Sequence, residues 1–298
     1  MTAAAAPFGR LLTAMVTPMT GDGAVDFDAA QRVATYLVDG GIDGLVLSGT
    51  TGESPTTSDA EKEQLIRVVH EAVGDRAQVV AGAGTNDTAH TIELARQAEK
   101  AGAAGLLVVT PYYSKPPQTG LLEHFRHVAD ATDLPVMVYD IPARAGVPIA
   151  TDTLLRLAEH DRIVAVKDAK GDLLETSRVL AGSDLAIYSG EDALNLPLLA
   201  LGAVGMVSVV AHACARQYAD MVRAVDAGDF AEARRLNAEV LPAVLAIMTR
   251  TQGAIMAKAA LQLLGVLDQR AMRLPLVAAT EEQVEELRRD LAAAGLIR

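Results

Sequence analysis

Lys167 carries the most chemical information of any residue in this chain. Of the six lysines in the 298 residues, it alone directly follows an apolar run, residues 163–166, that is typical of a buried strand. By two-residue alternation, Ile163, Ala165 and Lys167 share one face, and a small alanine leaves space for the lysine stem. Partial burial lowers the pKa of an ammonium and frees a neutral amine. Such an amine attacks a ketone and forms a Schiff base. An ion pair with Asp168 or Glu191 is the alternative interpretation.

Hydroxyl side chains stand at the ends of three other apolar runs. Thr50 and Tyr113 come just after residues 44–47 and 106–109, and Tyr139 ends the run 136–139. Schiff-base chemistry needs protons to be delivered and removed, and hydroxyl groups do this without adding a competing charge. The alternative is that these residues only pack or cap the strand ends.

Other motifs in the sequence give weaker indications of a function. The loop 49–53, GTTGE, offers backbone N–H groups to an anion but lacks the lysine of a nucleotide-binding loop. Residues 82–84, GAG, lack the third glycine of a dinucleotide fingerprint, because position 87 is Asp. His124 and His127 are spaced for one helix face, but no third ligand is evident, so we expect a solvated face and no metal site.

Apolar strand-like runs recur along the first two thirds of the chain. They are residues 11–16, 44–47, 78–81, 106–109, 136–139, 163–166, 185–188 and 205–209. Runs without alternation indicate strands covered on both faces, as in a parallel sheet. Stretches with helical spacing lie between them, and Ser58 with Glu61 predicts a capped helix start. Eight such units favour a (β/α)8 barrel, with a doubly wound open sheet as the alternative.

The pattern after residue 211 is helical alone. Residues 216–227, 230–248, 254–264 and 281–293 have helical spacing. We therefore expect a catalytic barrel over residues 1–228 and a C-terminal helical region over residues 229–298. In the barrel, chemistry belongs at the carboxyl ends of the strands, where Lys167 and the hydroxyl residues would meet.

Composition excludes several classes of protein. The formal net charge of −12 argues against binding to nucleic acid or anionic membranes. One cysteine, Cys214, excludes an intrachain disulfide and a multi-thiolate metal site. The first ten residues, MTAAAAPFGR, do not resemble an export signal, and no apolar run is long enough to span a bilayer. We expect a cytoplasmic protein.

Five motifs together resemble the dihydrodipicolinate synthase family of pyruvate-dependent class I aldolases, and its actinobacterial members most. They are GTTGE at 49–53, TPYY at 110–113, YDIPAR at 139–144, VKDAKGD at 166–172 and YSGED at 188–192. The resemblance runs almost end to end, and it implies a TIM barrel. It also implies condensation of pyruvate with L-aspartate-4-semialdehyde in the diaminopimelate route to lysine.

The resemblance implies a role for each candidate residue. Lys167 would form the Schiff base, so that no cofactor is needed, and Tyr139 would shuttle protons through Thr50 to Tyr113. Four residues would bind substrate: Thr51 the pyruvate carboxylate, Arg144 the carboxylate of the semialdehyde, and Gly190 and Val207 the pyruvate through their backbones.

The resemblance also implies an assembly and an effector groove. In the family the second tyrosine of the pair, here Tyr113, reaches the site of a neighbouring subunit, so we expect a homotetramer built from two dimers. Lysine-inhibited relatives bind lysine in a groove between subunits, and Ser54, Asn86 and Tyr112 match it. His90 replaces a carboxylate there, and Asp59 and Lys62 replace histidines, so we expect weak or absent inhibition.

Two other functions remain open at this point. One is an N-acetylneuraminate or keto-deoxy-sugar-acid lyase of the same superfamily, which shares the Schiff base. The mostly apolar stretch 144–148, RAGVP, argues against a polyhydroxylated substrate. The other is a barrel that binds without catalysis, which the presence of both Lys167 and Tyr139 disfavours.

Overall fold

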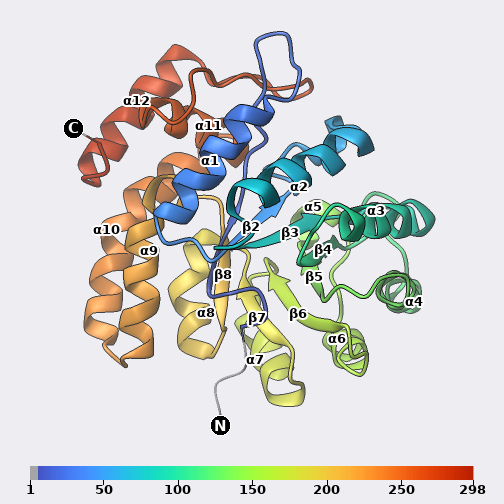
Figure 1. The fold of residues 1–298 in the computed structure, drawn as a ribbon. Helices are drawn as coiled ribbons and strands as arrows, with labels where there is room; N and C mark the ends of the chain where they lie inside the picture. Colours follow the sequence, from blue (N-terminus) through green and yellow to red (C-terminus); the bar gives the residue numbers. More distant parts are fainter. Residues whose placement is uncertain (1–5, 298) are drawn as a thin grey trace.

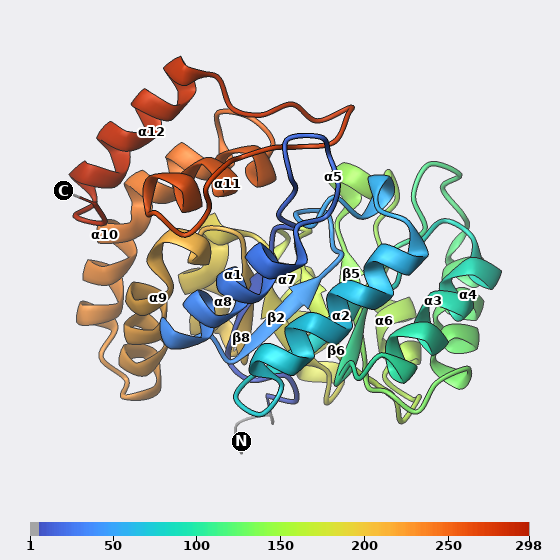
Figure 2. The ribbon, with the colours of Figure 1, turned by 45° about the horizontal axis from the view of Figure 1, so that its top comes forward.

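The computed structural model describes residues 6–297. Residues 1–5, half of the stretch compared with export signals, and Arg298 lie outside the described residues. Eight parallel strands pair in chain order and close into a barrel, with the helices around it (Figures 1 and 2). The strands are β1 (Leu11–Ala14), β2 (Gly44–Leu47), β3 (Gln78–Gly82), β4 (Gly105–Val109), β5 (Val136–Asp140), β6 (Ile163–Asp168), β7 (Ala186–Ser189) and β8 (Gly205–Ser208). The predicted barrel is confirmed, because β1 pairs with β8.

Helices connect and cover the strands. They are α1 (Phe27–Asp39), α2 (Asp59–Val73), α3 (Thr88–Lys100), α4 (Gln118–Asp130), α5 (Pro142–Ala145), α6 (Thr151–Leu157), α7 (Leu173–Gly182), α8 (Asn195–Leu201) and α9 (Ala211–Asp226), with 3₁₀ turns η1 (Ser54–Thr56) and η2 (Asp192–Leu194). The helix start expected at Ser58 is confirmed: Ser58 and Glu61 form a capping box at α2.

Three further helices gather on one side of the barrel (Figure 1). These are α10 (Phe230–Met248), α11 (Gly253–Leu263) and α12 (Glu281–Ala293). The C-terminal helical part is therefore confirmed, whereas its division from the barrel at residue 228 stays a prediction. Within residues 6–297 no single helix has the length and apolar character to cross a membrane, and α10 with α11 reaches both only as a pair bent by 116°.

Two apolar layers hold the barrel. The larger lies between strands and helices, and the smaller fills the barrel interior with Leu12, Val46, Met137 and their neighbours. Phe8 closes the amino-terminal end of the interior: it is fully buried, and its N–H donates to the Tyr188 hydroxyl (3.2 Å). The opposite end, where the carboxyl ends of the strands meet, is the barrel mouth.

One expectation about β6 was wrong in part. Ala165 faces the barrel interior, but Ile163 packs in the outer layer. The register with β5 shifts here, because Val136 pairs with Ile163 while the next residue, Met137, pairs with Ala165. This bulge breaks the two-residue alternation that the sequence pattern assumes.

Two helix expectations also need correction. Helix α9 begins at Ala211 rather than at residue 216, and its first turn bends at Cys214 (φ −134°, ψ 39°). His124 does not lie on a solvated face: it is buried, and its Nδ1 pairs with the Thr88 hydroxyl (2.9 Å). His127, three residues on, is exposed.

Candidate active site

A cavity of about 840 Å³ opens at the barrel mouth. It brings together eleven of the twelve residues singled out from the sequence: Thr50, Thr51, Ser54, Asn86, His90, Tyr112, Tyr113, Tyr139, Arg144, Lys167 and Gly190. Val207 is the exception. It is buried in the barrel interior, and Val209 lines the cavity instead.

Lys167 lies at the base of this cavity, only 5% exposed. Its register partner on β5 is Tyr139, and the Lys167 Nζ lies 4.1 Å from the centre of the Tyr139 ring. Gly190, just after β7, makes room for the lysine stem. A Cβ at that position would lie 2.9 Å from the Lys167 Cγ.

Burial lowers the pKa of Lys167 to about 8. The nearby Arg144 guanidinium lowers it further, while the Asp192 and Glu191 carboxylates oppose the change by favouring the ammonium. A substantial fraction of this amine is therefore neutral just above physiological pH, which an exposed lysine does not achieve.

Burial raises the pKa of Tyr139 to about 12, so that this phenol keeps its proton. Arg144 lowers that pKa, Glu191 raises it, and the Thr50 side chain is close enough to lower it slightly. No direct hydrogen bond joins the Thr50 hydroxyl to the Tyr139 phenol within this chain. The phenol is thus a proton donor held against the amine of Lys167.

Asp192 is a buried carboxylate near Lys167 that the sequence reasoning missed. It accepts hydrogen bonds from the backbone N–H groups of Val209 (2.9 Å) and Val210 (3.1 Å), from the Asn195 amide (3.1 Å) and from the Ser208 hydroxyl. These contacts tie η2 to the end of β8. The motif YSGED contains Asp192, but no local pattern shows that its side chain turns inward.

Tyr113 has an unusual conformation for a tyrosine. Its backbone is left-handed (φ 75°), and 88% of the residue is exposed although it borders the cavity. Ser48, Glu53 and Lys115 around the same mouth also have positive φ. Residues other than glycine adopt this region at an energetic cost, and such residues concentrate at functional sites.

Arg144 lies in the short helix α5, and the segment that follows α5 is tied to β5 and to Lys170, just after β6. Asp140 accepts a hydrogen bond from the Ile149 N–H (3.1 Å), and the Lys170 ammonium donates to the Ile149 carbonyl (3.0 Å). Lys170 Nζ also lies 3.5 Å from Asp140. Burial raises the pKa of Asp140 to about 6, and Lys170 opposes this rise. The exposed Arg144 therefore projects from a helix whose C-terminal side is held in place.

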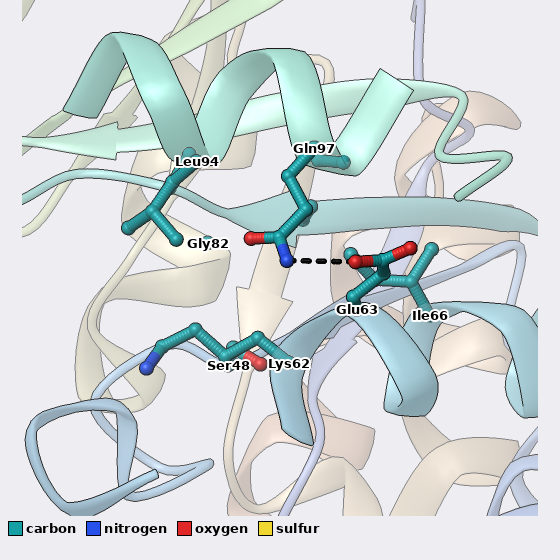
Figure 3. A pocket seen from close by; sticks show the side chains of 10 residues that line it. Ser48, Lys62, Glu63, Ile66, Gly82, Leu94 and Gln97 are labelled. Carbon is teal, nitrogen blue, oxygen red and sulfur yellow. Dashed lines mark hydrogen bonds between the residues drawn. The ribbon is translucent and has the colours of Figure 1, made fainter. Parts of the chain in front are cut away.

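The candidate effector groove lies on one flank of the cavity. His90 pairs with Asp59 (2.9 Å), and the buried Lys62 ammonium donates to the Thr57 carbonyl. Figure 3 shows Lys62 extending away from Glu63, which instead accepts a hydrogen bond from Gln97 (2.8 Å) between α2 and α3. No group of three or more His, Cys, Asp or Glu side chains within residues 6–297 is arranged to bind a metal ion.

Comparison with known proteins now decides the family. The sequence pattern that defines the dihydrodipicolinate synthetase family matches residues 7–294 of this chain. The chain belongs to this family. The family assignment made from the five motifs is confirmed, and with it an enzyme of the class I aldolase type.

Two similar proteins from other organisms carry the same enzyme name. A 4-hydroxy-tetrahydrodipicolinate synthase of Kineococcus radiotolerans is 66% identical over 290 residues, which are 97% of this chain and 94% of the relative. One of Mycobacterium leprae is 57% identical over 293 residues, 98% of this chain and 97% of the relative. The resemblance to actinobacterial members of the synthase branch is therefore confirmed.

Solved structures of family members have the same fold. Dihydrodipicolinate synthase from Cyanidioschyzon merolae, crystallised with lysine bound, has a TM-score of 0.94 and 42% identity and covers 98% of this chain and 99% of its own. The chloride-inhibited enzyme from Acinetobacter baumannii, complexed with pyruvate, has a TM-score of 0.92 and 35% identity, covering 97% and 99%.

Proposed function

We propose that the protein is a 4-hydroxy-tetrahydrodipicolinate synthase that condenses pyruvate with L-aspartate-4-semialdehyde, with no cofactor beyond its own lysine. The observation that carries this proposal is the buried amine of Lys167, with its pKa lowered to about 8, against the protonated phenol of Tyr139. The relatives named as such synthases support the choice of substrates.

The first half of the reaction attaches pyruvate to the enzyme. The neutral Lys167 amine attacks the keto carbon, and the resulting carbinolamine loses water as Tyr139 donates a proton to the leaving hydroxyl. Thr51 binds the pyruvate carboxylate, to which its backbone N–H donates a hydrogen bond. The Tyr139 phenolate left by the loss of water then takes a proton from the methyl group, which gives an enamine with the electron pair delocalised toward the imine nitrogen.

The second half forms a carbon–carbon bond. The enamine carbon attacks the aldehyde carbon of the semialdehyde, whose carboxylate pairs with the Arg144 guanidinium. The new alkoxide takes a proton through Tyr139. The amino group of the semialdehyde then attacks the imine carbon, closes the ring and expels the Lys167 amine, which restores the enzyme.

Tyr113 completes the proton path from a second copy of the chain. In its own chain it projects into solvent from a strained backbone, which is the conformation expected of a side chain that docks into a partner. The assembly proposed is a homotetramer of two such dimers. Thr50 would then bridge the two tyrosines within each site.

Borohydride reduction tests this proposal. In the presence of pyruvate, the wild-type protein gains a reduced adduct located on Lys167 by peptide mass analysis. Lys167→Ala gains none, whereas Lys170→Ala, which removes a neighbouring lysine, still gains it. Absence of an adduct in the wild type overturns the enzyme proposal. Cleavage of N-acetylneuraminate without ring product from pyruvate and semialdehyde would assign the lyase function instead.

A further inference from the structure

A buried ion pair fixes the GTTGE loop from outside the barrel. The carboxylate of Glu53, the last residue of this loop, accepts hydrogen bonds from Lys258 Nζ on α11 (2.5 Å) and from the Arg273 backbone N–H (2.9 Å). The same ammonium donates to the Ala271 carbonyl (2.7 Å). Both side chains of the ion pair are 1% exposed. The pair thus joins the GTTGE loop to the C-terminal helical part away from the protein surface.

The other side of the loop is fixed by Thr17, in the segment that follows β1. The Thr17 hydroxyl donates to the Gly52 carbonyl (2.7 Å). A Cβ at Gly52 would lie 3.0 Å from the Ser48 backbone nitrogen and 3.2 Å from the Met15 carbonyl oxygen, so the loop packs closely against β1 and β2. Thr51 directly precedes the two attached residues, Gly52 and Glu53, in the loop.

Stability alone gives a weak reason for the ion pair. A buried pair of charges often contributes no more than apolar side chains of the same volume, while loss of one partner leaves a costly lone charge. The C-terminal segment also has an attachment to α2 that does not involve Glu53: the Arg273 guanidinium donates to Glu61 (2.5 and 2.9 Å) and to the Thr56 carbonyl (2.8 Å).

The pair acts instead on the shape of the loop. Glu53 has a left-handed backbone (φ 57°), and its N–H and carbonyl make local hydrogen bonds to Thr50 and Thr56. Its carboxylate makes no capping hydrogen bond to η1 and depends on contacts from elsewhere in the chain. Those contacts come from Lys258 and from the backbone at residue 273. Lys258 is the only charged residue in helix α11, and this lone charge is the sequence signal for its role.

We propose that Glu53 and Lys258 are a positioning pair, through which the C-terminal helices hold Thr50 and Thr51 in the geometry that binds the carboxylate of the keto acid. This inference rests on the proposed function. Neither residue of the pair contacts the substrate. A loop displaced by their loss binds pyruvate less well, while the Arg144 site for the second substrate stays intact.

The test compares Glu53→Gln, Lys258→Met and the double variant carrying both. We expect the pyruvate concentration that gives half-maximal borohydride trapping to rise about tenfold in all three. The KM for semialdehyde should change less than twofold. The double variant has no lone buried charge, so its thermal midpoint should return close to that of the wild type even though its pyruvate binding stays weak.

The control is Arg250→Met. It removes the ion pairs from Arg250 to Glu286 and Asp290, which join the segment after α10 to α12 and do not involve the GTTGE loop. It should leave the pyruvate dependence unchanged. If the double variant regains wild-type pyruvate dependence together with its thermal midpoint, the pair is merely structural and the inference is wrong. Wild-type protein that traps no pyruvate would overturn the proposed function itself, a distinct outcome.

Discussion

The reactivity of Lys167 results from opposing local effects. Burial and the Arg144 guanidinium favour the neutral amine, and the Asp192 and Glu191 carboxylates favour the ammonium, with a resulting pKa of about 8. The balance leaves part of the amine neutral and so able to attack a ketone. In the proposed reaction, the buried Tyr139 phenol, which keeps its proton, would protonate the leaving hydroxyl.

The pH dependence of adduct formation follows from this pKa. At saturating pyruvate, the rate of adduct formation should rise as pH increases through about 8 and level off about one unit above it. An ordinary lysine would continue to gain reactivity to well above pH 10. Rates measured by rapid borohydride quenching from pH 6 to 10.5 would contradict this if no plateau is reached below about pH 10.

Neighbouring charges should shift this profile in opposite directions. Arg144→Met removes a cation, so the pKa of Lys167 rises and the midpoint moves to higher pH. Glu191→Gln removes an anion, so the pKa falls and the midpoint moves to lower pH. The same quenching assay measures both. Equal shifts of one sign would show that these charges do not act on the amine.

Gly190→Ala should impair the lysine without unfolding the barrel. The added Cβ would lie 2.9 Å from the Lys167 Cγ and 3.1 Å from the Ala169 Cβ, so the lysine stem must move. We expect adduct formation at least about tenfold slower. Gly120→Ala in α4, where a Cβ meets its nearest atom at 3.5 Å, is the matched control and should keep the wild-type rate.

Local pattern was enough to find Lys167 and Tyr139, because each ends an apolar strand run and strand ends in a barrel converge. It was not enough for Asp192 or Lys258, whose roles depend on contacts with residues distant in the chain. Ile163 shows a third limit. A bulge against β5 changes the face on which this residue lies, and no residue type in β6 predicts that bulge.

At the scale of elements, helices α2 and α3 contribute Asp59, Lys62 and His90 to the candidate effector groove. This groove already contains a cation, since Lys62 is buried there and donates to the Thr57 carbonyl. Asp59, the carboxylate available to an incoming ammonium, is engaged by His90 (2.9 Å). The ammonium of a bound lysine molecule would therefore be repelled by Lys62. It would also find the Asp59 carboxylate already paired with His90.

Feedback inhibition by lysine should accordingly be weak or absent. The wild-type enzyme should keep more than half of its activity at low-millimolar lysine in a steady-state assay. His90→Glu, which adds a carboxylate and releases Asp59, should bind lysine more tightly than the wild type by calorimetry. Half-inhibition of the wild type in the low-millimolar range or below would contradict the expectation.

Element boundaries were predictable where the ends are defined locally. The capping box of Ser58 and Glu61 marks the start of α2 in the sequence and in the structure. The start of α9 was not predictable, because Asp192 binds the N–H groups of Val209 and Val210 from another part of the chain and so stabilises an earlier first turn.

At the scale of the whole molecule, each site is expected to need two chains. Lys167→Ala and Tyr113→Phe should each be nearly inactive alone. After the two are unfolded together and refolded, half of the dimers are mixed, and each mixed dimer has one site with Lys167 from one chain and Tyr113 from the other. About a quarter of wild-type activity should return.

The control mixes Lys167→Ala with Tyr139→Phe. Lys167 and Tyr139 of one site come from the same chain. Each site of a mixed dimer therefore lacks one of the two residues, and no activity should return. Recovery in the first mixture that is no larger than in this control would place Tyr113 outside the partner's site.

The barrel has one open end, because Phe8 and the hydrogen bond of its N–H to Tyr188 close the other. Any molecule that reaches Lys167 must enter and depart by the same passage. The small keto acid has to be seated deepest before the larger aldehyde follows, and the aldehyde then obstructs the way behind it. An excess of the second substrate should therefore compete with the first for entry and slow turnover. The single opening of the barrel thus imposes an order of substrate binding.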